Sequence, residues 1–341
     1  MRIATYNVEW FSNLFDNEGT LLDDNRWSGR RDIVRMDQIA ALGVVFKMMD
    51  ADAIMVIEAP DGHARRDGVA ALENFAAHFG LRARSALMGF VNETQQEITL
   101  LYDPDKMSAR HDPIGEQTGK HGARDAPRFD SVFRIDLDTD AAPDLVRWSK
   151  PPLEIAVETA SGTALRMIGV HAKSKAPHGA RNKAEVIRIS IENRRKQLAQ
   201  CIWLRQRIEG HLEAGEPLIV MGDFNDGPGL DEYEKLFGRS GIEIVIGEDG
   251  ATRLFDPHAR MALSRRIVAT PTTARFKLPP DGRFLQALLD YIMVSPDLER
   301  RAPVWTIWHP FDHPACYANA MLRDALLTAS DHFPVTIDID L

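Results

Sequence analysis

Short apolar runs rich in β-branched residues alternate along this chain with longer segments of helical periodicity. Such runs favour pleated, half-buried strands, which we expect at residues 2–10, 51–59, 97–104, 153–159, 164–174, 217–225, 289–296 and 331–341. Apolar residues recur at helical spacing in residues 32–50, 69–80 and roughly 181–213. The two kinds of segment do not alternate strictly, so the pattern favours a mixed-sheet α/β sandwich over a barrel.

Composition is consistent with one globular domain. Of the 341 residues, 44% are hydrophobic and 27% charged, which is ordinary usage for a protein with a sizeable core. No repeat, low-complexity tract or Gly/Ser-rich linker interrupts the chain, so we expect a single domain over residues 1–341. An irregular insertion is expected around 104–152, with a possible hairpin in "RFDSVFRIDL". Cys201 and Cys316 are the two cysteines, too few for a disulfide framework or a Cys-rich zinc site.

The formal net charge is −9. This is the wrong sign for a protein that coats nucleic acid, because phosphate neutralisation supplies most non-specific affinity. An enzyme that holds phosphate through a cation and a local basic patch is compatible with it. No apolar run reaches the roughly 18–20 residues of a membrane span, and no secretory leader precedes the first strand. The expected location is cytoplasmic, although a secreted protein with its leader removed would show the same features.

Polar side chains follow several of the apolar runs at the point where each run ends. In "LIVMGDFNDGP", Asp223 and Asn225 would project from one face of a strand and Phe224 from the other. A strand followed by an Asx turn would explain this stretch equally well. The pattern recurs, however, at Asn7, Glu58, His171, Asp290, Asp331 and His332. Because such groups are costly to bury unpaired, their repetition favours a shared site.

If these strand ends converge, their side chains form a site of definite chemical character. Glu58, Asp223 and Asp331 offer hard oxygen ligands, which suit Mg²⁺, with Mn²⁺ or Ca²⁺ as alternatives, better than zinc or copper. The two histidines would act as acid and base near neutral pH, and the two asparagines would donate hydrogen bonds to phosphate oxygens. Together these groups predict metal-assisted hydrolysis of a phosphoester.

Six segments, in this order, resemble motifs of the endonuclease/exonuclease/phosphatase superfamily, to which deoxyribonuclease I belongs. They are "TYNVEW", "MVIEA", "IGVHAKSK", "GDFND", "LDYIMVS" and "SDHFPV", and they extend from residue 5 to residue 335. The resemblance implies a four-layer α/β sandwich of the deoxyribonuclease I-like kind. Two mixed β-sheets would pack together, flanked by helices, with the site at one edge.

The resemblance also implies roles for the metal and water positions. Glu58 would be the principal metal ligand, with Asn7 beside it, and Asp331 would help to bind the metal. Asp223 would orient or deprotonate the attacking water, and Asn225 would hold the phosphate.

For the histidines, the resemblance implies that His332 contacts the phosphate or acts as general base, oriented by Asp290. His171 stands where deoxyribonuclease I and sphingomyelinases carry a histidine. In the deoxyribonuclease-like pattern a carboxylate pairs with that histidine, and here the position falls on Gln96 or Glu97. A slip of one residue would turn the side chain to the other face of its strand.

Three lysines are predicted to contact substrate phosphate. Lys150 stands where many superfamily members carry an arginine before proline, and lysine offers a point charge where arginine offers a bidentate fork. Lys173 and Lys175 follow His171 in a basic segment. From Arg188 onward the basic residues fit a solvated helix face at least as well as a phosphate-binding surface.

The favoured function is a metal-dependent phosphoesterase that cleaves phosphodiester bonds by in-line attack of water, namely an endonuclease acting on DNA or RNA. One alternative is a phosphatase, or a phospholipase-like phosphodiesterase, for a small soluble or lipid phosphate. A catalytically inactive binding module is the other. The expected partner is thus a phosphoester substrate, with nucleic acid as the favoured one. No heptad pattern in the sequence indicates an oligomeric state.

Overall fold

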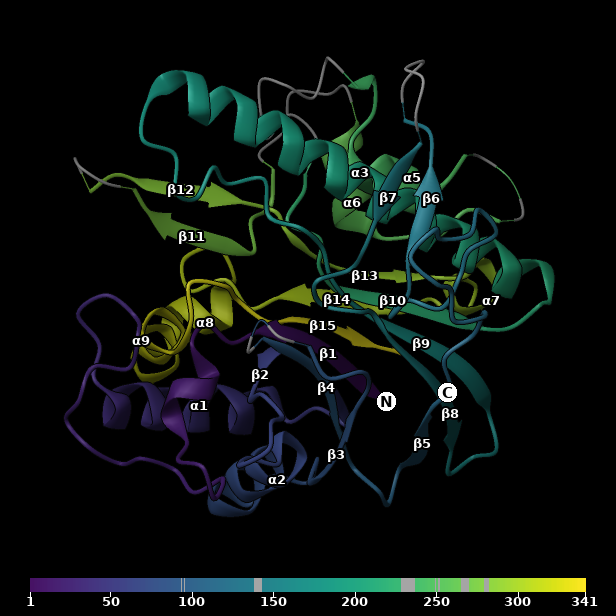
Figure 1. Ribbon diagram of the computed structural model, residues 1–341. Coiled ribbons are helices and arrows are strands. Elements are labelled where there is room, and N and C mark those ends of the chain that lie inside the picture. The colour runs from purple at the N-terminus through teal and green to yellow at the C-terminus, as the bar shows by residue number, and fades with distance from the viewer. Residues whose placement is uncertain are drawn as a thin grey trace.

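The computed structural model describes residues 1–92, 94, 96–137, 143–227, 237–248, 250, 252–264, 270–278 and 282–341. Its centre consists of two mixed β-sheets packed face to face (Figure 1). The first sheet has the order β14 (Val304–Ile307), β15 (Val335–Asp338), β1 (Arg2–Asn7), β2 (Ala53–Ala59), β4 (Glu97–Tyr102) and β3 (Ser85–Met88). Strands β1 and β2 are parallel, and the other pairs in this sheet are antiparallel.

The second sheet has the order β13 (Asp290–Val294), β10 (Leu218–Asp223), β9 (Ala164–His171), β8 (Leu153–Thr159) and β5 (Met107–His111). Strand β10 runs parallel to β9 and antiparallel to β13. The register therefore places Asp223 directly beside His171 on one side and beside Asp290 on the other. Three of the predicted polar residues meet at one edge of this sheet.

Helices cover the outer faces of both sheets and complete the four layers (Figure 1). The core over the first sheet is formed with α1 (Arg35–Met49), α2 (Gly68–Phe79) and α9 (Ala320–Ala329). The core over the second is formed with α3 (Lys183–Glu213), α5 (Gly241–Ile246) and α6 (Pro257–Leu263). Shorter helices are η1 (Phe11–Leu14), α7 (Pro296–Glu299) and α8 (Pro314–Ala318). The fold predicted from the sequence is confirmed, and no helix in the described part of the chain is long and apolar enough to span a bilayer.

Glycines allow two close approaches behind the site. Gly222 precedes Asp223 on β10 with φ of 139°, and a Cβ there would lie 2.0 Å from the carbonyl oxygen of Val170 on β9. Gly169 faces the other sheet, where a Cβ would lie 2.4 Å from Sδ of Met55. Any side chain at these positions would push apart the strands that carry the site.

Two hairpins rise beside the sheets. The stretch 104–152, expected to be irregular, supplies β5 to the second sheet and then β6 (Phe133–Ile135) and β7 (Asp144–Val146), which pair with each other. The second hairpin joins β11 (Ala274–Lys277) to β12 (Phe284–Ala287). No strand was predicted at this second hairpin, which stands over the edge of the sheets where the polar residues gather (Figure 1).

Candidate active site

The predicted strand-end residues gather at one edge of the sandwich and line a cleft with a volume of about 1330 Å³. Strands β1, β2, β9 and β10 end at this edge, and the antiparallel strand β13 begins there. All of the predicted site residues except Asp290 line the cleft: Asn7, Glu58, Lys150, His171, Lys173, Lys175, Asp223, Asn225, Asp331 and His332. Asp290 lies behind His332, fully enclosed.

The Asp223 carboxylate joins the two sheets. Its Oδ2 accepts hydrogen bonds from Nδ2 of Asn7 and Nδ2 of Asn225, each at 3.0 Å, and its Oδ1 accepts one from the backbone N–H of Asn225 at 2.7 Å. Burial raises the pKa of Asp223 to about 7, and the nearby Asp290 adds to the rise while His332 opposes it. The backbone of Asn225 has a φ of 50°, which turns its amide back toward this carboxylate. The Asp-Phe-Asn sequence at 223–225 is therefore both an Asx turn and part of the site.

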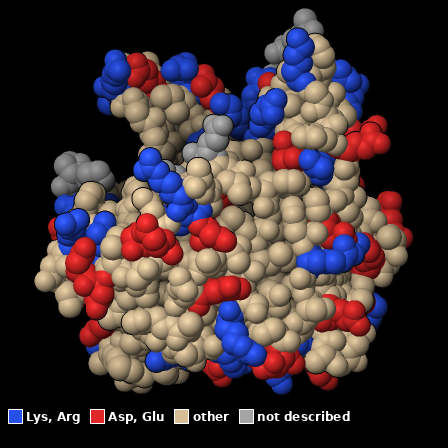
Figure 2. All heavy atoms as spheres, turned by 60° about the horizontal axis from the view of Figure 1, so that its bottom comes forward, with Lys and Arg blue, Asp and Glu red and all other residues tan. Residues whose placement is uncertain are grey.

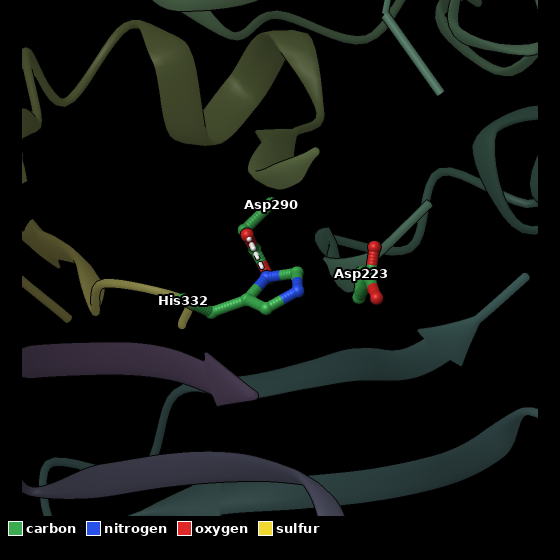
Figure 3. Close-up of side chains that lie close together, drawn as sticks. All are labelled: Asp223, Asp290 and His332. Carbon is green, nitrogen blue, oxygen red and sulfur yellow. Dashed lines mark hydrogen bonds and ion pairs between the residues drawn. The ribbon is translucent and has the colours of Figure 1, made fainter. Parts of the chain in front are cut away.

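His332 is held between two carboxylates (Figure 3). Its Nδ1 donates to Oδ2 of Asp290 at 2.7 Å, while its second ring nitrogen faces Asp223. Burial by itself disfavours the imidazolium, but it is outweighed by the negative charge and hydrogen bond of Asp290 and by the charge of Asp223. These interactions hold the pKa of His332 well above its usual value. His332 thus presents a hydrogen-bond donor to the cleft.

Glu58 occupies an irregular position in β2. The pairing of β2 with β4 shifts register between Ile57 and Ala59, and Glu58 has a φ of 60°. A bulge of this kind re-aims a side chain at the cost of local strain, and such strain is concentrated at functional sites. Burial raises the pKa of Glu58, opposed chiefly by the charge of Lys150. The bulge explains how a residue of a buried strand directs its carboxyl group into the cleft.

His171 and Lys150 form a second polar pair. Nζ of Lys150 lies 3.0 Å from Nε2 of His171. Nε2 of His171 also lies 3.6 Å from Oδ2 of Asp223 and 3.9 Å from Oε1 of Glu58. Burial, followed by the charge of Lys150, holds the pKa of His171 well below its usual value. Burial also lowers the pKa of Lys150 to about 8, against the opposing effects of Glu58 and Asp223. A neutral His171 can accept the hydrogen bond that Lys150 donates.

The partner expected for His171 at position 96 or 97 does not contact it in the structure. Gln96 hydrogen-bonds to Glu58, whereas the Glu97 carboxylate is buried against Asn92 at 2.6 Å. Within the described chain, Nδ1 of His171 has no hydrogen-bond partner. Neither candidate therefore pairs with His171, and Gln96 contributes to the site through Glu58.

Lys173 and Lys175 differ in their surroundings. Lys173 lines the cleft, and the peptide groups on either side of it are held by Gln197 and Gln200 of α3. Lys175 also lines the cleft, but its Nζ donates to Oδ1 of the wholly buried Asp226 at 2.5 Å. Its role as a phosphate ligand stays a prediction, while its structural role is to tie the 172–178 loop to the end of β10.

Sequence reasoning overlooked two acidic residues around the site, Asp226 and Glu9. Asp226 receives hydrogen bonds from Lys175 and from Arg194 of α3, the latter at 3.0 Å. Glu9 lines the cleft, pairs with Arg30 and accepts a hydrogen bond from Nε1 of Trp10 at 3.0 Å. Burial, followed by the charge of Asp331, raises the pKa of Glu9 to about 7. Its position two residues after Asn7 was the available signal, because alternate strand residues share a face.

The donor set fits a hard divalent cation. Carboxylate oxygens of Asp223 and Asp290 and a ring nitrogen of His332 lie within 4.8 Å of one another, although the hydrogen bond between Asp290 and His332 occupies one donor of each. In the described chain, the buried Oδ1 of Asn7 has no hydrogen-bond partner while its Nδ2 is bonded to Asp223. An amide oxygen oriented in this way beside several carboxylates suits Mg²⁺, Mn²⁺ or Ca²⁺.

Comparison with known proteins connects this geometry to a family. A family model described as Endonuclease/Exonuclease/phosphatase family matches residues 4–332. Truncated TDP2 from Caenorhabditis elegans has a TM-score of 0.50 at 13% identity, over 98% of this chain and 96% of that one. A functionally unknown conserved protein from Enterococcus faecalis has a TM-score of 0.47 at 17% identity, over 100% and 99%. A mannosyl-6-phosphatase from Bacteroides thetaiotaomicron has 0.46 at 14%, over 100% of both chains.

At these identities the likeness to solved structures concerns the fold alone. No curated protein sequence matches the chain. The family match, by contrast, spans every one of the predicted site residues from Asn7 to His332.

Proposed function

The chain belongs to the Endonuclease/Exonuclease/phosphatase family, and from this premise we propose that it is a divalent-metal-dependent phosphodiesterase acting on nucleic acid. One observation carries the proposal. Asp223 and His332 face each other in a single cleft, and Asp290 holds His332 from behind. A carboxylate opposite a hydrogen-bonded imidazole is an arrangement suited to in-line displacement at phosphorus, with one group on the water and the other on the phosphate.

In this proposal Asp223 orients the attacking water and accepts its proton. The hydrogen bonds from Asn7 and Asn225 fix the position of the carboxylate, so that water would meet it in one geometry. Such positioning accounts for a large part of catalysis in phosphoryl transfer, since the transition state asks little covalent chemistry of the protein.

His332 contacts the phosphate in the proposed mechanism. Because Nδ1 is bonded to Asp290, the remaining ring N–H is directed into the cleft, where it can donate to a non-bridging or leaving oxygen. Lys150 approaches the same floor from the opposite side, beside His171. The Asn225 amide donates one N–H to Asp223 and the other to the carbonyl oxygen of Ala172, so in this mechanism it holds Asp223 in place rather than contacting the phosphate. Positive charge and N–H groups on two sides of the phosphate would stabilise the charge that develops on its oxygens.

A divalent cation would be held by Glu58, Asn7 and Asp331. Asp331 lies close enough to Glu58 for its charge to raise the pKa of Glu58 beyond the effect of burial, and Asn7 presents an unpartnered amide oxygen among the described residues. When bound there, the ion would neutralise phosphate charge and polarise the phosphorus–oxygen bonds.

The size of the cleft favours a polymeric substrate. At about 1330 Å³ it is larger than the roughly 300–1,000 Å³ typical of pockets for small ligands. A strand of nucleic acid can extend through such a cleft, whereas a small sugar phosphate would fill only part of it.

The decisive experiment is nicking of supercoiled plasmid by the purified protein in EDTA, in Mg²⁺ and in Mn²⁺, with His332→Ala as the matched control. We expect nicking that requires the metal and is lost in the variant. Single-stranded DNA and RNA are tested in parallel. If all three polymers stay intact while a phosphomonoester or an inositol phosphate is hydrolysed, the protein is a phosphatase and the proposal is wrong.

A further inference from the structure

The β11–β12 hairpin forms an apolar wall of the cleft directly above the proposed catalytic residues. Phe276 and Leu285 are paired across the hairpin and line the cleft together. Leu278, Ala287 and Leu289 extend this wall. Residues that alternate with them, such as Arg275 and Phe284, are on the other face of the hairpin. The hairpin is thus amphipathic, and its more continuous apolar face is directed into the cleft that is proposed to hold a charged substrate.

We propose that this wall binds an unpaired nucleobase next to the scissile phosphate, so that the enzyme acts on single-stranded nucleic acid or on frayed ends. The inference rests on the proposed function and deepens it by naming the substrate class. Flat, sequence-tolerant contact between bases and aromatic or apolar side chains is the usual way in which proteins hold a single strand. In a duplex the base faces are covered by their stacked neighbours, so a double helix would leave Phe276 and Leu285 without a partner.

The wall is fixed relative to the chemistry. Ala274 forms a bridge with His332, and the backbone N–H of Arg275 donates to the carbonyl oxygen of Asp331 at 2.7 Å. The Phe276 ring meets the His332 imidazole edge to face, with 5.5 Å between ring centroids. A base that stacks on Phe276 therefore lies next to a phosphate held by His332. The spacing between the stacked base and the bound phosphate is therefore set by backbone contacts of the protein rather than by a movable loop.

Basic and polar side chains from outside the hairpin line the same cleft. They include Lys173, Lys196 and Gln200, and Lys173 and Lys196 are near enough to repel each other. Such a pair suits the neighbouring phosphates of a strand whose base is on the hairpin. Basic side chains also gather beside the notch at the upper edge of the face shown in Figure 2, while acidic side chains are spread over the body below it.

A lipid phosphodiester would also bring an apolar group to a phosphate, but the geometry favours a base. The apolar residues of the hairpin line the same cleft as Lys173 and Lys196, so the group that contacts them lies beside basic side chains. On the outer side of the hairpin, the guanidinium of Arg275 lies 3.4 Å from the centroid of the Phe284 ring. That charge covers the ring which would otherwise be the natural contact with acyl chains.

The test measures binding by fluorescence anisotropy in an Asp223→Asn background with Mg²⁺, so that the strand is not cut. The probes are an eight-nucleotide thymidine strand, an abasic strand with the same number of phosphates, and a duplex of equal length. We expect the thymidine strand to bind at least about tenfold more tightly than the abasic strand. Phe276→Ala and Leu285→Ala should each weaken thymidine binding by about five- to thirtyfold and leave abasic binding unchanged.

Phe284→Ala is the matched control, since it removes the same side chain from the other face of the same hairpin. Leu285→Ala guards against an indirect effect of Phe276→Ala on His332. The inference is overturned if thymidine and abasic strands bind alike, or if Phe276→Ala and Leu285→Ala match Phe284→Ala. It is also overturned if these two variants lose binding to phosphatidylserine vesicles while thymidine binding is kept. Failure of the proposed function looks different, because wild-type protein would then cleave no nucleic acid at all.

Discussion

Oδ2 of Asp290 lies 2.7 Å from Nδ1 of His332, and this contact joins the two halves of the sandwich. Asp290 begins β13 in the second sheet, and His332 precedes β15 in the first. Both side chains are buried, so neither can reorient without losing the other. The pair therefore sets the direction in which the free nitrogen of His332 points.

We expect Asp290→Asn to reduce kcat by about 10²- to 10⁴-fold, the range of a general acid–base contribution. An amide can bond to Nδ1 but supplies no charge to hold the imidazolium, so the pKa of His332 should fall. The measurement is single-turnover cleavage across pH, alongside a thermal unfolding curve. A variant that unfolds like wild type and cleaves like wild type would mean that Asp290 does not act through His332.

Asp223→Ala and His332→Ala should each abolish turnover without unfolding the protein. Asp223 is buried with a pKa raised to about 7, so its removal relieves an unfavourable burial and the fold can tolerate it. Asp223→Asn, which keeps the shape and the neighbouring amides, should be as inactive as Asp223→Ala. Retention of most of the wild-type rate by either alanine variant would show that the site has been misplaced.

Metal binding should be visible in the unfolding curve as well as in activity. A ligand that binds only the folded state at about 100 times its Kd stabilises by about 2.7 kcal/mol. Mg²⁺ should therefore raise the Tm of wild-type protein first stripped with EDTA, and Glu58→Gln should remove most of that rise. Glu97→Gln is the control, because Glu97 is a buried carboxyl that is bonded to Asn92 and does not line the cleft. If Mg²⁺ raises the Tm of Glu58→Gln and Glu97→Gln by the same amount, the metal is bound elsewhere.

Lys150 should be acylated at lower pH than the other lysines of the metal-free protein. Its pKa is lowered to about 8, against about 10.4 for an ordinary lysine. The neutral, reactive amine consequently appears as pH rises through about 8. Peptide mapping after brief treatment with acetic anhydride across pH 6–11, in EDTA, would give the titration.

Glu58→Gln tests the direction in which the charge of Glu58 shifts the pKa of Lys150. The charge of Glu58 raises the pKa of Lys150 against the larger effect of burial, so its loss should move the midpoint further down. A midpoint that rises in this variant would contradict the account.

Asp226→Asn should destabilise the fold strongly. Asp226 is wholly buried and holds both Lys175 and the almost wholly buried Arg194. The amide offers one oxygen acceptor and no charge in place of the carboxylate, and each lost hydrogen bond to a charged group costs about 1.5–3 kcal/mol. Lys175→Met should cost less, because Arg194 still pairs with Asp226. Urea unfolding measures both, and equal losses would show that the two cations are held independently of Asp226.

The sequence indicated the main strands because each carries a dense apolar run, and it indicated the site because polar residues ended those runs. The register of these strands depends on which strands pair with one another, and no local sequence pattern contains that information. Asp223 meets His171 and Asp290 only because β10 lies between β9 and β13. The GD pair was visible, but the 2.0 Å approach to Val170 that requires Gly222 depends on the neighbouring strand.

Other features depended on tertiary contacts in the same way. The choice between Gln96 and Glu97 turned on a bulge at Glu58, one residue out of register in a strand pair. Lys175 looked identical to Lys173 along the chain and differs through Asp226, 51 positions later. The β11–β12 hairpin was not predicted because each of its strands has only four residues, in which Arg, Lys and Gln alternate with Phe and Leu. An alternation of this length cannot be distinguished from a loop.

Strand β1 lies between β2 and β15, so the first strand of the chain cannot be fully paired until the last has been synthesised. Asn7 and Glu58 emerge early from a translating ribosome, whereas Asp290, Asp331 and His332 come more than 200 residues later. A nascent polypeptide thus carries two of the three proposed metal ligands long before the imidazole that would work with them. Hydrolytic competence in this way requires that synthesis has passed His332, and a product terminated before that residue would be inert.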